Sequence, residues 1–251
     1  MKTLDVPFET VQAHFTARAP RYDGSSRWCT DAVLLDRMVA LVDPYPDCSV
    51  LDVATGTGLV ARALVGRVGR ITGLDVNAAM ANRALVALDA LVEGSAEAMP
   101  LPSGSFDRVI CRQGIQFMDA RRAVAEMVRV TRPGGRVVLV DLCAWGEQDE
   151  REVFEILRLR NPARRNFFVR GDTALLLGEA GCTSVEVHDH ASEEDIDVWT
   201  DHGAIDELRR EAIREVYRHA SDAFRRLHEV RLDDGRIVDR MLFGIAVGQV
   251  S

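Results

Sequence analysis

The sequence predicts an α/β fold whose mostly parallel, doubly wound sheet carries helices on both faces, and three observations support this. Residues 50–53, VLDV, form a short, largely apolar run of the length of a buried strand. A turn with Gly56 and Gly58 follows and leads into a helix. Residues 70–74 form a second short strand, and Asp75 comes directly after it. Strands that alternate with helices favour a parallel sheet.

Two carboxylates in this unit predict a nucleotide-like cofactor. Asp52 interrupts the first strand, and a carboxylate so close to a core is costly unless a cationic or hydrogen-bonding group meets it. Asp75 stands at the carboxyl edge of the second strand, where open α/β sheets bind their ligands. We therefore expect a ribose at Asp75 and a cationic group at Asp52.

Two cofactors compete for this motif. Gly56, Gly58 and Ala61 fit the dinucleotide fingerprint GxGxxG/A, and Asp75 follows Gly58 by seventeen residues. Asp52 argues against NAD, because a carboxylate that points toward a pyrophosphate would repel it. S-adenosylmethionine has an ammonium group, a ribose diol and no phosphate, so the residues favour S-adenosylmethionine.

The motif also resembles that of a known family. LDVATGTG, residues 51–58, resembles motif I, (D/E)xGxGxG, of the class I S-adenosylmethionine-dependent methyltransferases, with Ala54 in place of the first glycine. Residues 93–118 resemble the family's adenine loop and fourth strand, and residues 126–141 resemble its PGG turn into the fifth strand. Among these enzymes, the chain resembles the ubiquinone/menaquinone-biosynthesis type of small-molecule methyltransferases.

This resemblance implies the overall architecture. It implies a Rossmann-like, doubly wound, mostly parallel seven-stranded sheet with an antiparallel last strand, an N-terminal helical lid and a helical cap inserted between the last two strands. We expect a single domain over residues 1–251. Its parts are a lid over residues 1–47, a cofactor-binding core over 48–142, a substrate loop and cap helices over 143–234, and a final strand over 235–251.

The individual elements follow from local signals. Two helices precede the first strand: one lies between Pro7 and Pro20, and the other begins after Thr30 or Asp31. An NAD-binding domain often begins with its strand, so this preface fits a methyltransferase better. Further helices are expected at residues 77–88, 119–130, 148–159, 172–180, 193–200 and 206–230, the last with a break near His219. Further strands are expected at residues 91–92, 106–111, 136–142, 184–190 and 237–250.

The composition disfavours several classes of partner. The 251 residues contain 31 Lys and Arg against 39 Asp and Glu, a net charge of −8, which disfavours a nucleic-acid partner. No apolar run reaches the roughly 18 residues of a membrane span, and the first residues lack the apolar core of a signal peptide. The five scattered cysteines favour reduced thiols in a cytoplasmic protein. We expect a monomer or a homodimer.

The residue pattern and the resemblance together predict the cofactor-binding residues. They are Tyr22, Asp52, Ala54, Gly56, Gly58, Asp75, Val76, Met80, Ser95, Ala96, Glu97 and Gln113. Tyr22 lies in residues 15–23, which loosely match the lid motif FxxxAxxYD with one extra residue before the tyrosine. Ser95 stands where the family usually has an aspartate that meets the adenine amino group. We therefore expect the Ala96 backbone and Glu97 to take over that contact.

The acceptor is expected to be chosen by the last third of the chain together with the end of the fourth strand. Residues 160–172 mix several arginines with Phe167 and Phe168. This loop could clamp an acidic group, because arginine offers a planar fork, or it could be a solvated surface around two aromatic anchors. The candidate substrate residues are Trp28, Gln116, Phe117, Arg160, Arg164, Phe167, Phe168 and Trp199.

Two histidines are candidate catalytic residues. An O-methyl acceptor or a carbon acid benefits from a base of near-neutral pKa, so His14 on the lid helix and His202 in the cap are candidate bases. For each, a purely structural place in the lid or at the surface stays open. His188 and His190 share one face of a strand but lack a third ligand, so no metal site is expected.

The sequence thus predicts an enzyme, an S-adenosylmethionine-dependent methyltransferase. It would methylate an O, N or C atom of a small-molecule acceptor of acidic, quinone or natural-product type. CRQG, residues 111–114, stands where DNA methyltransferases carry (D/N)PP(Y/F), in agreement with a small-molecule acceptor. Two alternatives remain open: an NAD(P)-dependent oxidoreductase and a non-catalytic S-adenosylmethionine-binding protein.

Overall fold

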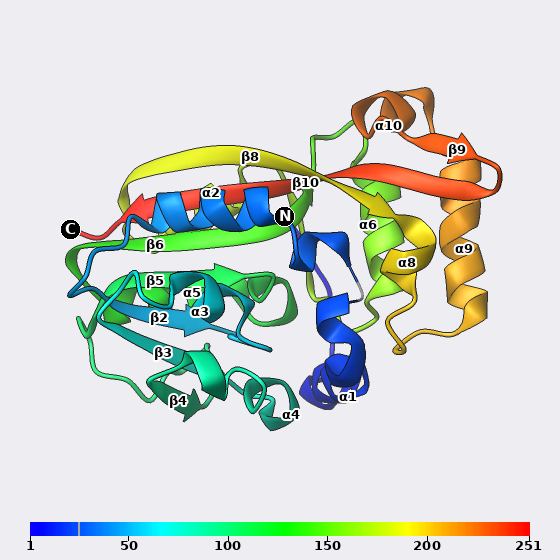
Figure 1. Ribbon diagram of the computed structural model, residues 1–251. Coiled ribbons are helices and arrows are strands. Elements are labelled where there is room, and N and C mark those ends of the chain that lie inside the picture. Colours follow the sequence, from blue (N-terminus) through cyan, green and yellow to red (C-terminus); the bar gives the residue numbers. More distant parts are fainter. Residues whose placement is uncertain (25) are drawn as a thin grey trace.

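A computed structural model describes residues 1–24 and 26–251 (Figure 1). Its main sheet has seven strands in the order β4-β3-β2-β5-β6-β10-β8. The strands are β2 (Ser49–Val53), β3 (Arg70–Asp75), β4 (Ala90–Glu93), β5 (Phe106–Arg112), β6 (Thr131–Ala144), β8 (Thr183–Asp195) and β10 (Arg236–Gln249). Strands β2 to β6 pair in parallel, whereas β10 runs antiparallel to both β6 and β8. This is the sheet that the sequence predicts.

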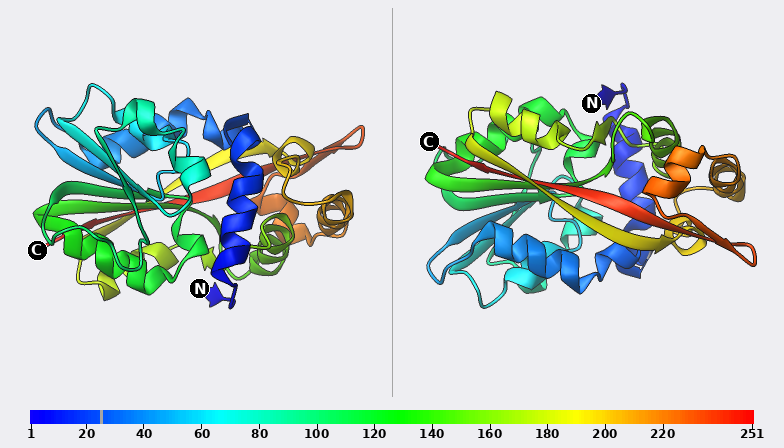
Figure 2. Two further views of the ribbon diagram at one scale, coloured as in Figure 1. Left: turned by 90° about the horizontal axis from the view of Figure 1, so that it is seen from below. Right: turned by 90° about the horizontal axis from the view of Figure 1, so that it is seen from above.

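Helices cover both faces of this sheet (Figure 2). The helices are α1 (Phe8–Arg18), α2 (Ala32–Val42), α3 (Leu59–Leu64), α4 (Ala78–Ala81), α5 (Ala120–Val130), α6 (Glu150–Arg160), α7 (Asp172–Glu179), α8 (Ile196–Thr200), α9 (Glu207–Arg218) and α10 (Asp222–Leu227). Short 3-10 turns lie at Ala19–Gly24, Arg27–Cys29, Leu85–Ala87 and Ile115–Phe117. Among the described residues, no helix is long and apolar enough to cross a membrane.

The core consists of two apolar clusters, one on each face of the sheet. Along β2, Val50 packs with α2 and α3 on one face, whereas Leu51 and Val53 pack on the opposite face with α5 and α7. This alternation is the period of two that a strand imposes on its side chains. Of the two predicted caps, Thr30 and Asp31, Asp31 caps α2, and its carboxylate accepts a hydrogen bond of 3.1 Å from the Leu34 amide.

Three predicted elements differ from the structure. Residues 77–88 do not form one helix, because α4 is short and the chain continues through i→i+3 hydrogen bonds into a 3-10 turn. Residues 193–195 are strand and not helix, because β8 stays paired with β10 as far as Asp195. Residues 160–172 are not a free loop: β7 (Asn166–Val169) pairs with the end of β6, and β1 (Lys2–Thr3) pairs with β7.

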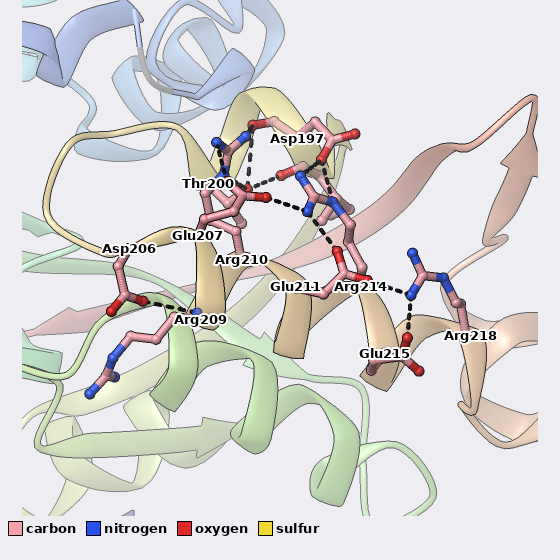
Figure 3. Close-up of polar contacts among 11 residues, drawn as sticks. Asp197, Thr200, Asp206, Glu207, Arg209, Arg210, Glu211, Arg214, Glu215 and Arg218 are labelled. Atoms are coloured by element: carbon pink, nitrogen blue, oxygen red, sulfur yellow. Dashed lines mark hydrogen bonds and ion pairs between the residues drawn. The ribbon is translucent and has the colours of Figure 1, made fainter.

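The cap projects beyond the sheet and contains α6, α8, α9, α10 and the hairpin of β9 (Arg231–Asp233) with β10 (Figure 1). The guanidinium of Arg214 on α9 lies 2.7 Å from Glu207, 2.8 Å from Glu211 and 2.7 Å from Asp197 on α8 (Figure 3). These pairs join two cap helices, although each partly exposed pair contributes little stability by itself.

Candidate functional site

A cavity of about 420 Å³ opens at the carboxyl edge of the parallel strands. Helix α1 lies across this end of the core, between the sheet and the cap (Figure 2). The lining residues come from the lid, the turns after β2 and β3, the loop after β4 and the end of β5. They are Val6, Phe8, Val11, Gln12, Phe15, Tyr22, Ala54, Gly56, Asp75, Val76, Asn77, Met80, Ser95, Ala96, Glu97, Arg112, Gln113, Gly114, Phe117, Met118 and Arg165. Pockets of this size at a strand edge are ligand sites.

Asp75 is held rigidly at this edge. Its two carboxylate oxygens accept hydrogen bonds of 2.8 Å from the backbone amides of Gly56 and Asn77. The side chain is buried, and this burial raises its pKa above the ordinary value. Each carboxylate oxygen can accept a further hydrogen bond, so Asp75 fits the hydroxyl groups of a ribose.

Asp52 lies beneath the glycine turn and not on the main cavity. It is 1% exposed, accepts a hydrogen bond of 2.7 Å from Thr55 Oγ1, and burial raises its pKa to about 7. Together with Tyr22 and Arg112, it lines a narrow recess of about 30 Å³ that adjoins the cavity. A cation in that recess would compensate the cost of burying the carboxylate, which fits the ammonium of S-adenosylmethionine.

The glycine turn has two functions. Ala54 and Gly56 have φ of 54° and 55° and line the cavity. Gly58, with φ of 82°, does not line it: a Cβ there would lie 2.9 Å from Ala84. The expectation that Gly58 contacts the cofactor is therefore corrected, because its missing side chain serves packing against residues after β3.

The loop after β4 is fixed by its own side chains. Ser95 Oγ accepts a hydrogen bond of 3.1 Å from the Glu97 amide. The Glu97 carboxylate accepts one of 2.7 Å from the Asp119 amide and lies 3.6 Å from Arg165. Ser95, Ala96 and Glu97 all line the cavity, as do the predicted residues Val76 and Met80.

The end of β5 presents an amide to the cavity. Gln113 has φ of 56°, unusual for a residue with a side chain, and its Oε1 accepts a hydrogen bond of 2.9 Å from Gln116 Nε2. The Gln113 Nε2 group has no hydrogen-bond partner among the described residues. Gly114 follows, and a Cβ there would lie 2.6 Å from Cys111 Sγ and 2.8 Å from Ala54 Cβ. The strand end is therefore tightly built.

Among the predicted substrate residues, only Phe117 lines the cavity. Arg164 is buried and donates to the carbonyls of Leu142 and Asn166, at 3.0 and 2.9 Å. Phe167 and Phe168 lie in the core, because β7 joins the sheet. The structure therefore does not form the predicted clamp of Arg160, Arg164, Phe167 and Phe168.

The remaining four predicted substrate residues also lie outside the lining of the main cavity, although Trp28 borders the recess of Asp52. Arg160 donates to the Trp199 carbonyl at 3.0 Å, and its guanidinium lies 4.2 Å from the centre of the Trp199 ring. Trp28 is buried beneath the guanidinium of Arg112, at 4.8 Å, and Gln116 is behind Gln113. These residues support the site from behind.

His14 and His202 form a buried pair outside the cavity. Their ring centres are 5.8 Å apart, and His14 Nε2 lies 2.9 Å from Asn161 Oδ1. Burial and the charge of Arg18 lower the pKa of His14 to about 3, and burial lowers that of His202 further still. Neither ring lines the cavity, so the structure does not place them as bases for an acceptor. Within residues 1–24 and 26–251, no group of three His, Cys, Asp or Glu side chains could hold a metal ion.

Several lining residues are not among the site residues predicted from the sequence, notably Gln12, Phe15, Asn77, Arg112 and Arg165. Phe15 lies on the apolar face of α1, and an apolar helix face must pack against another part of the protein. This pattern could have predicted that Phe15 covers the cavity. Arg112 ends a strand at the ligand-binding edge, which was also a usable signal.

Comparisons with known proteins agree with this geometry. Residues 51–139 match the family model described as methyltransferase domain. A demethylmenaquinone methyltransferase of Deinococcus radiodurans is 36% identical over 155 residues, which cover 53% of this chain and 60% of that protein. The chain spans between 41 and 63% of the length of the curated relatives it matches.

Solved structures show the same fold. The YcgJ protein of Bacillus subtilis has a TM-score of 0.79 at 24% identity and covers 86% of this chain and 97% of its own. A geranyl diphosphate C-methyltransferase of Streptomyces coelicolor, in complex with Mg²⁺, geranyl diphosphate and S-adenosylhomocysteine, has a TM-score of 0.58 at 14% identity, with 88 and 78% covered.

The fold, the site and the match over residues 51–139 support an S-adenosylmethionine-dependent methyltransferase of class I. The family, fold class and cofactor predicted from the sequence are confirmed at this level.

Proposed function

We propose that this protein transfers a methyl group from S-adenosylmethionine to an O, N or C atom of a small-molecule acceptor. The observation that carries the proposal is the pair of buried carboxylates on either side of the Gly56 turn, Asp75 at the cavity and Asp52 at the recess that adjoins it. When bound, the cofactor supplies a methyl carbon activated by a sulfonium, which a lone pair of the acceptor can attack.

The residues of this chain would hold the cofactor by its three polar parts. Asp75 would accept hydrogen bonds from the ribose, and Asp52 would meet the ammonium through the recess. The loop with Ser95, Ala96 and Glu97 would border the adenine. None of these contacts requires rearrangement of the glycine turn, since both carboxylates are already fixed by hydrogen bonds from the chain.

The acceptor would lie beside Gln113, under the lid. Phe8, Phe15 and Phe117 give this part of the cavity an aromatic surface, and the amide of Gln113 offers a hydrogen-bond donor. An aromatic acceptor of quinone or natural-product type fits these contacts, and the name of the D. radiodurans relative supports this class. The work of the chain would then be to align the acceptor and exclude water.

The chain would contribute no histidine base to this step. His14 and His202 are outside the lining, and among the described lining residues the titratable groups other than arginine are Tyr22, Asp75 and Glu97. We therefore propose that the acceptor arrives with a nucleophile that needs no strong base.

We further propose that residues 1–47 act as the lid and residues 143–234 as the cap. We also propose that the enzyme acts in the cytoplasm, as its five free cysteines suggest.

A methyl-transfer assay tests the proposal. The protein is incubated with S-adenosylmethionine carrying an isotopically labelled methyl group and a panel of hydroquinones, phenols and aromatic acids. Formation of S-adenosylhomocysteine together with labelled acceptor supports the proposal. At limiting cofactor, Asp75→Ala should lower the rate by about tenfold or more, whereas the exposed Asp36→Ala should not. Tight cofactor binding without transfer to any of the panel favours the non-catalytic alternative.

A further inference from the structure

One arginine in the wall of the main cavity makes no side-chain hydrogen bond within the described part of the chain. Arg165 lines this cavity, and its Nε is buried without a partner. Within residues 1–24 and 26–251, its guanidinium has a single ion pair, in which Nη1 lies 3.6 Å from the Glu97 carboxylate. That distance is too long for a hydrogen bond, and a guanidinium carries five N–H donors. The hydrogen-bonding capacity of Arg165 is therefore unused.

The three other arginines of residues 160–172 are used by the fold. Arg160 and Arg164 donate to backbone carbonyls at 2.9 to 3.0 Å, and Arg170 pairs with Asp189 at 2.8 Å. The described lining of the cavity includes none of these three. The fourth arginine of the stretch thus differs from its neighbours both in where it lies and in what it contacts.

Arg165 is held on the acceptor side of the cavity through Gln116. The Arg165 amide donates to the Gln116 carbonyl at 2.8 Å, and the Gln116 side chain donates to Gln113 Oε1 at 2.9 Å. The Arg165 carbonyl accepts a hydrogen bond of 2.7 Å from the Leu4 amide, so its backbone is fixed on both sides. The wall beside Gln113 and Phe117, where the acceptor is proposed to lie, therefore includes this guanidinium.

The cofactor, as placed above, does not neutralise this charge. Its amino-acid end is assigned to the recess of Asp52, and the described lining of that recess does not include Arg165. Its ribose and adenine are uncharged. Glu97 is a weak partner, because its carboxylate already accepts a hydrogen bond of 2.7 Å from the Asp119 amide, and a partly exposed ion pair contributes little. The positive charge of Arg165 is therefore available to an anionic ligand in the cavity.

We propose that Arg165 binds a carboxylate of the methyl acceptor, which makes the acceptor an aromatic acid. A guanidinium can hold both oxygens of a carboxylate in its planar fork. Phe8 and Phe117 in the same lining offer surfaces for the aromatic body. Gln113 Nε2, which has no partner among the described residues, offers a second donor. This inference rests on the proposed function and names the substrate class of that site.

Calorimetric titration with 2-naphthoate and its neutral analogue 2-naphthamide tests the proposal, in protein saturated with S-adenosylhomocysteine. We expect the acid to bind roughly tenfold more tightly than the amide. Arg165→Gln should remove most of this preference and leave the affinity for the amide unchanged. Arg170→Gln is the matched control from the same stretch: it pairs with Asp189 outside the cavity and should leave both affinities unchanged. Equal affinity of the wild-type protein for acid and amide would refute the proposal.

A second variant separates this role from a purely structural pairing of Arg165 with Glu97. Glu97→Gln keeps an oxygen for the Asp119 amide but removes the charge that competes for the guanidinium. We expect this variant to keep the preference for the acid or to increase it by up to roughly threefold. If Glu97→Gln and Arg165→Gln lose the preference equally, the pair itself is what matters and the proposal is wrong.

The cofactor is the competing partner of Arg165, and a titration with S-adenosylhomocysteine alone separates the two. Arg165→Gln should bind S-adenosylhomocysteine as tightly as the wild-type protein does. A loss of that affinity together with an unchanged preference for the acid would assign Arg165 to the cofactor and overturn the proposal.

Two further controls keep the outcome clear. Thermal melts show whether Arg165→Gln folds, and if it does not, Arg165→Lys replaces it: lysine keeps the charge and loses the fork, so weaker naphthoate binding is still expected. The naphthoate titration is also run without cofactor. Wild-type protein that binds naphthoate through Arg165 but does not bind S-adenosylhomocysteine would refute the proposed function and leave the acid site standing.

Discussion

The carboxylate of Asp75 accepts a hydrogen bond of 2.8 Å from the backbone amide of Gly56. This bond joins the end of β3 to the turn after β2, so the two halves of the cofactor platform are held as one unit. A second bond, from the Asn77 amide, fixes the other carboxylate oxygen. The site is therefore preorganised by the backbone around one acid.

Replacing that acid should weaken cofactor binding. We predict that Asp75→Ala lowers the affinity for S-adenosylhomocysteine by more than tenfold, or about 1.4 kcal/mol, because the ribose loses its acceptor and Gly56 loses its partner. Calorimetry measures the effect, with the exposed Asp36→Ala as the matched control. Unchanged affinity in a folded Asp75→Ala protein would refute the ribose assignment.

Ala54, which stands in the glycine motif, should make the folded protein less stable than a glycine at that position would. Ala54 has φ of 54°, in the left-handed region that glycine adopts without strain. Ala54→Gly should therefore raise the free energy of unfolding by roughly 0.5–1 kcal/mol, after the greater freedom of glycine in the unfolded chain is subtracted. Urea denaturation measures this, and a destabilised variant would show that the Ala54 methyl group packs better than its backbone conformation suggests.

A methyl group at Gly114 should disrupt the end of β5. Because its Cβ would lie 2.6 Å from Cys111 Sγ and 2.8 Å from Ala54 Cβ, Gly114→Ala should destabilise the protein by roughly 1–3 kcal/mol and weaken S-adenosylhomocysteine binding. Gly178→Ala is the control: it lies in α7 with open space around it and should be neutral or stabilising. Equal melting temperatures for the two variants would contradict the packing described here.

The core of the fold could be predicted from the sequence because its signals are local. An apolar run, a glycine turn and a terminal acid mark β2, α3 and β3 one after the other. Asp75, Ala54 and Gly56 were found in this way, and all three line the cavity.

The acceptor side could not be predicted because it depends on long-range pairing. Nothing near Arg164 shows that β7 will join the sheet beside β6 and bury that side chain. Likewise, His14 and His202 are far apart in sequence, and only the docking of lid against cap makes them a buried pair. Arg112 stands in the CRQG stretch of the sequence, but its orientation is set by Trp28, far away along the chain.

The cap should lose stability at high pH through His228. Its Nδ1 lies 2.8 Å from Asp239 and its Nε2 lies 2.9 Å from Asp149, so it joins α10, β10 and the start of α6. Burial alone would lower the pKa of His228, but the two carboxylates outweigh burial and raise it to about 9. A raised folded-state pKa adds stability that is complete below about pH 6.5 and is lost as the pH rises through about 9.

The test compares wild type with His228→Gln across this range. The stability difference between the two should shrink by about 3 kcal/mol between pH 6 and pH 10, measured by urea denaturation. A difference that does not change with pH would mean that the pKa of His228 is not raised in the folded protein.

The central claim is that this cavity binds S-adenosylmethionine through Asp52 and Asp75. The most direct measurement is a calorimetric titration of the wild-type protein with S-adenosylhomocysteine, run beside one with NADH. We predict binding of S-adenosylhomocysteine with a Kd on the order of micromolar, about −8 kcal/mol, and no binding of NADH. Binding of NADH alone would contradict the assignment of Asp52 to an ammonium group and the account of the site built on it.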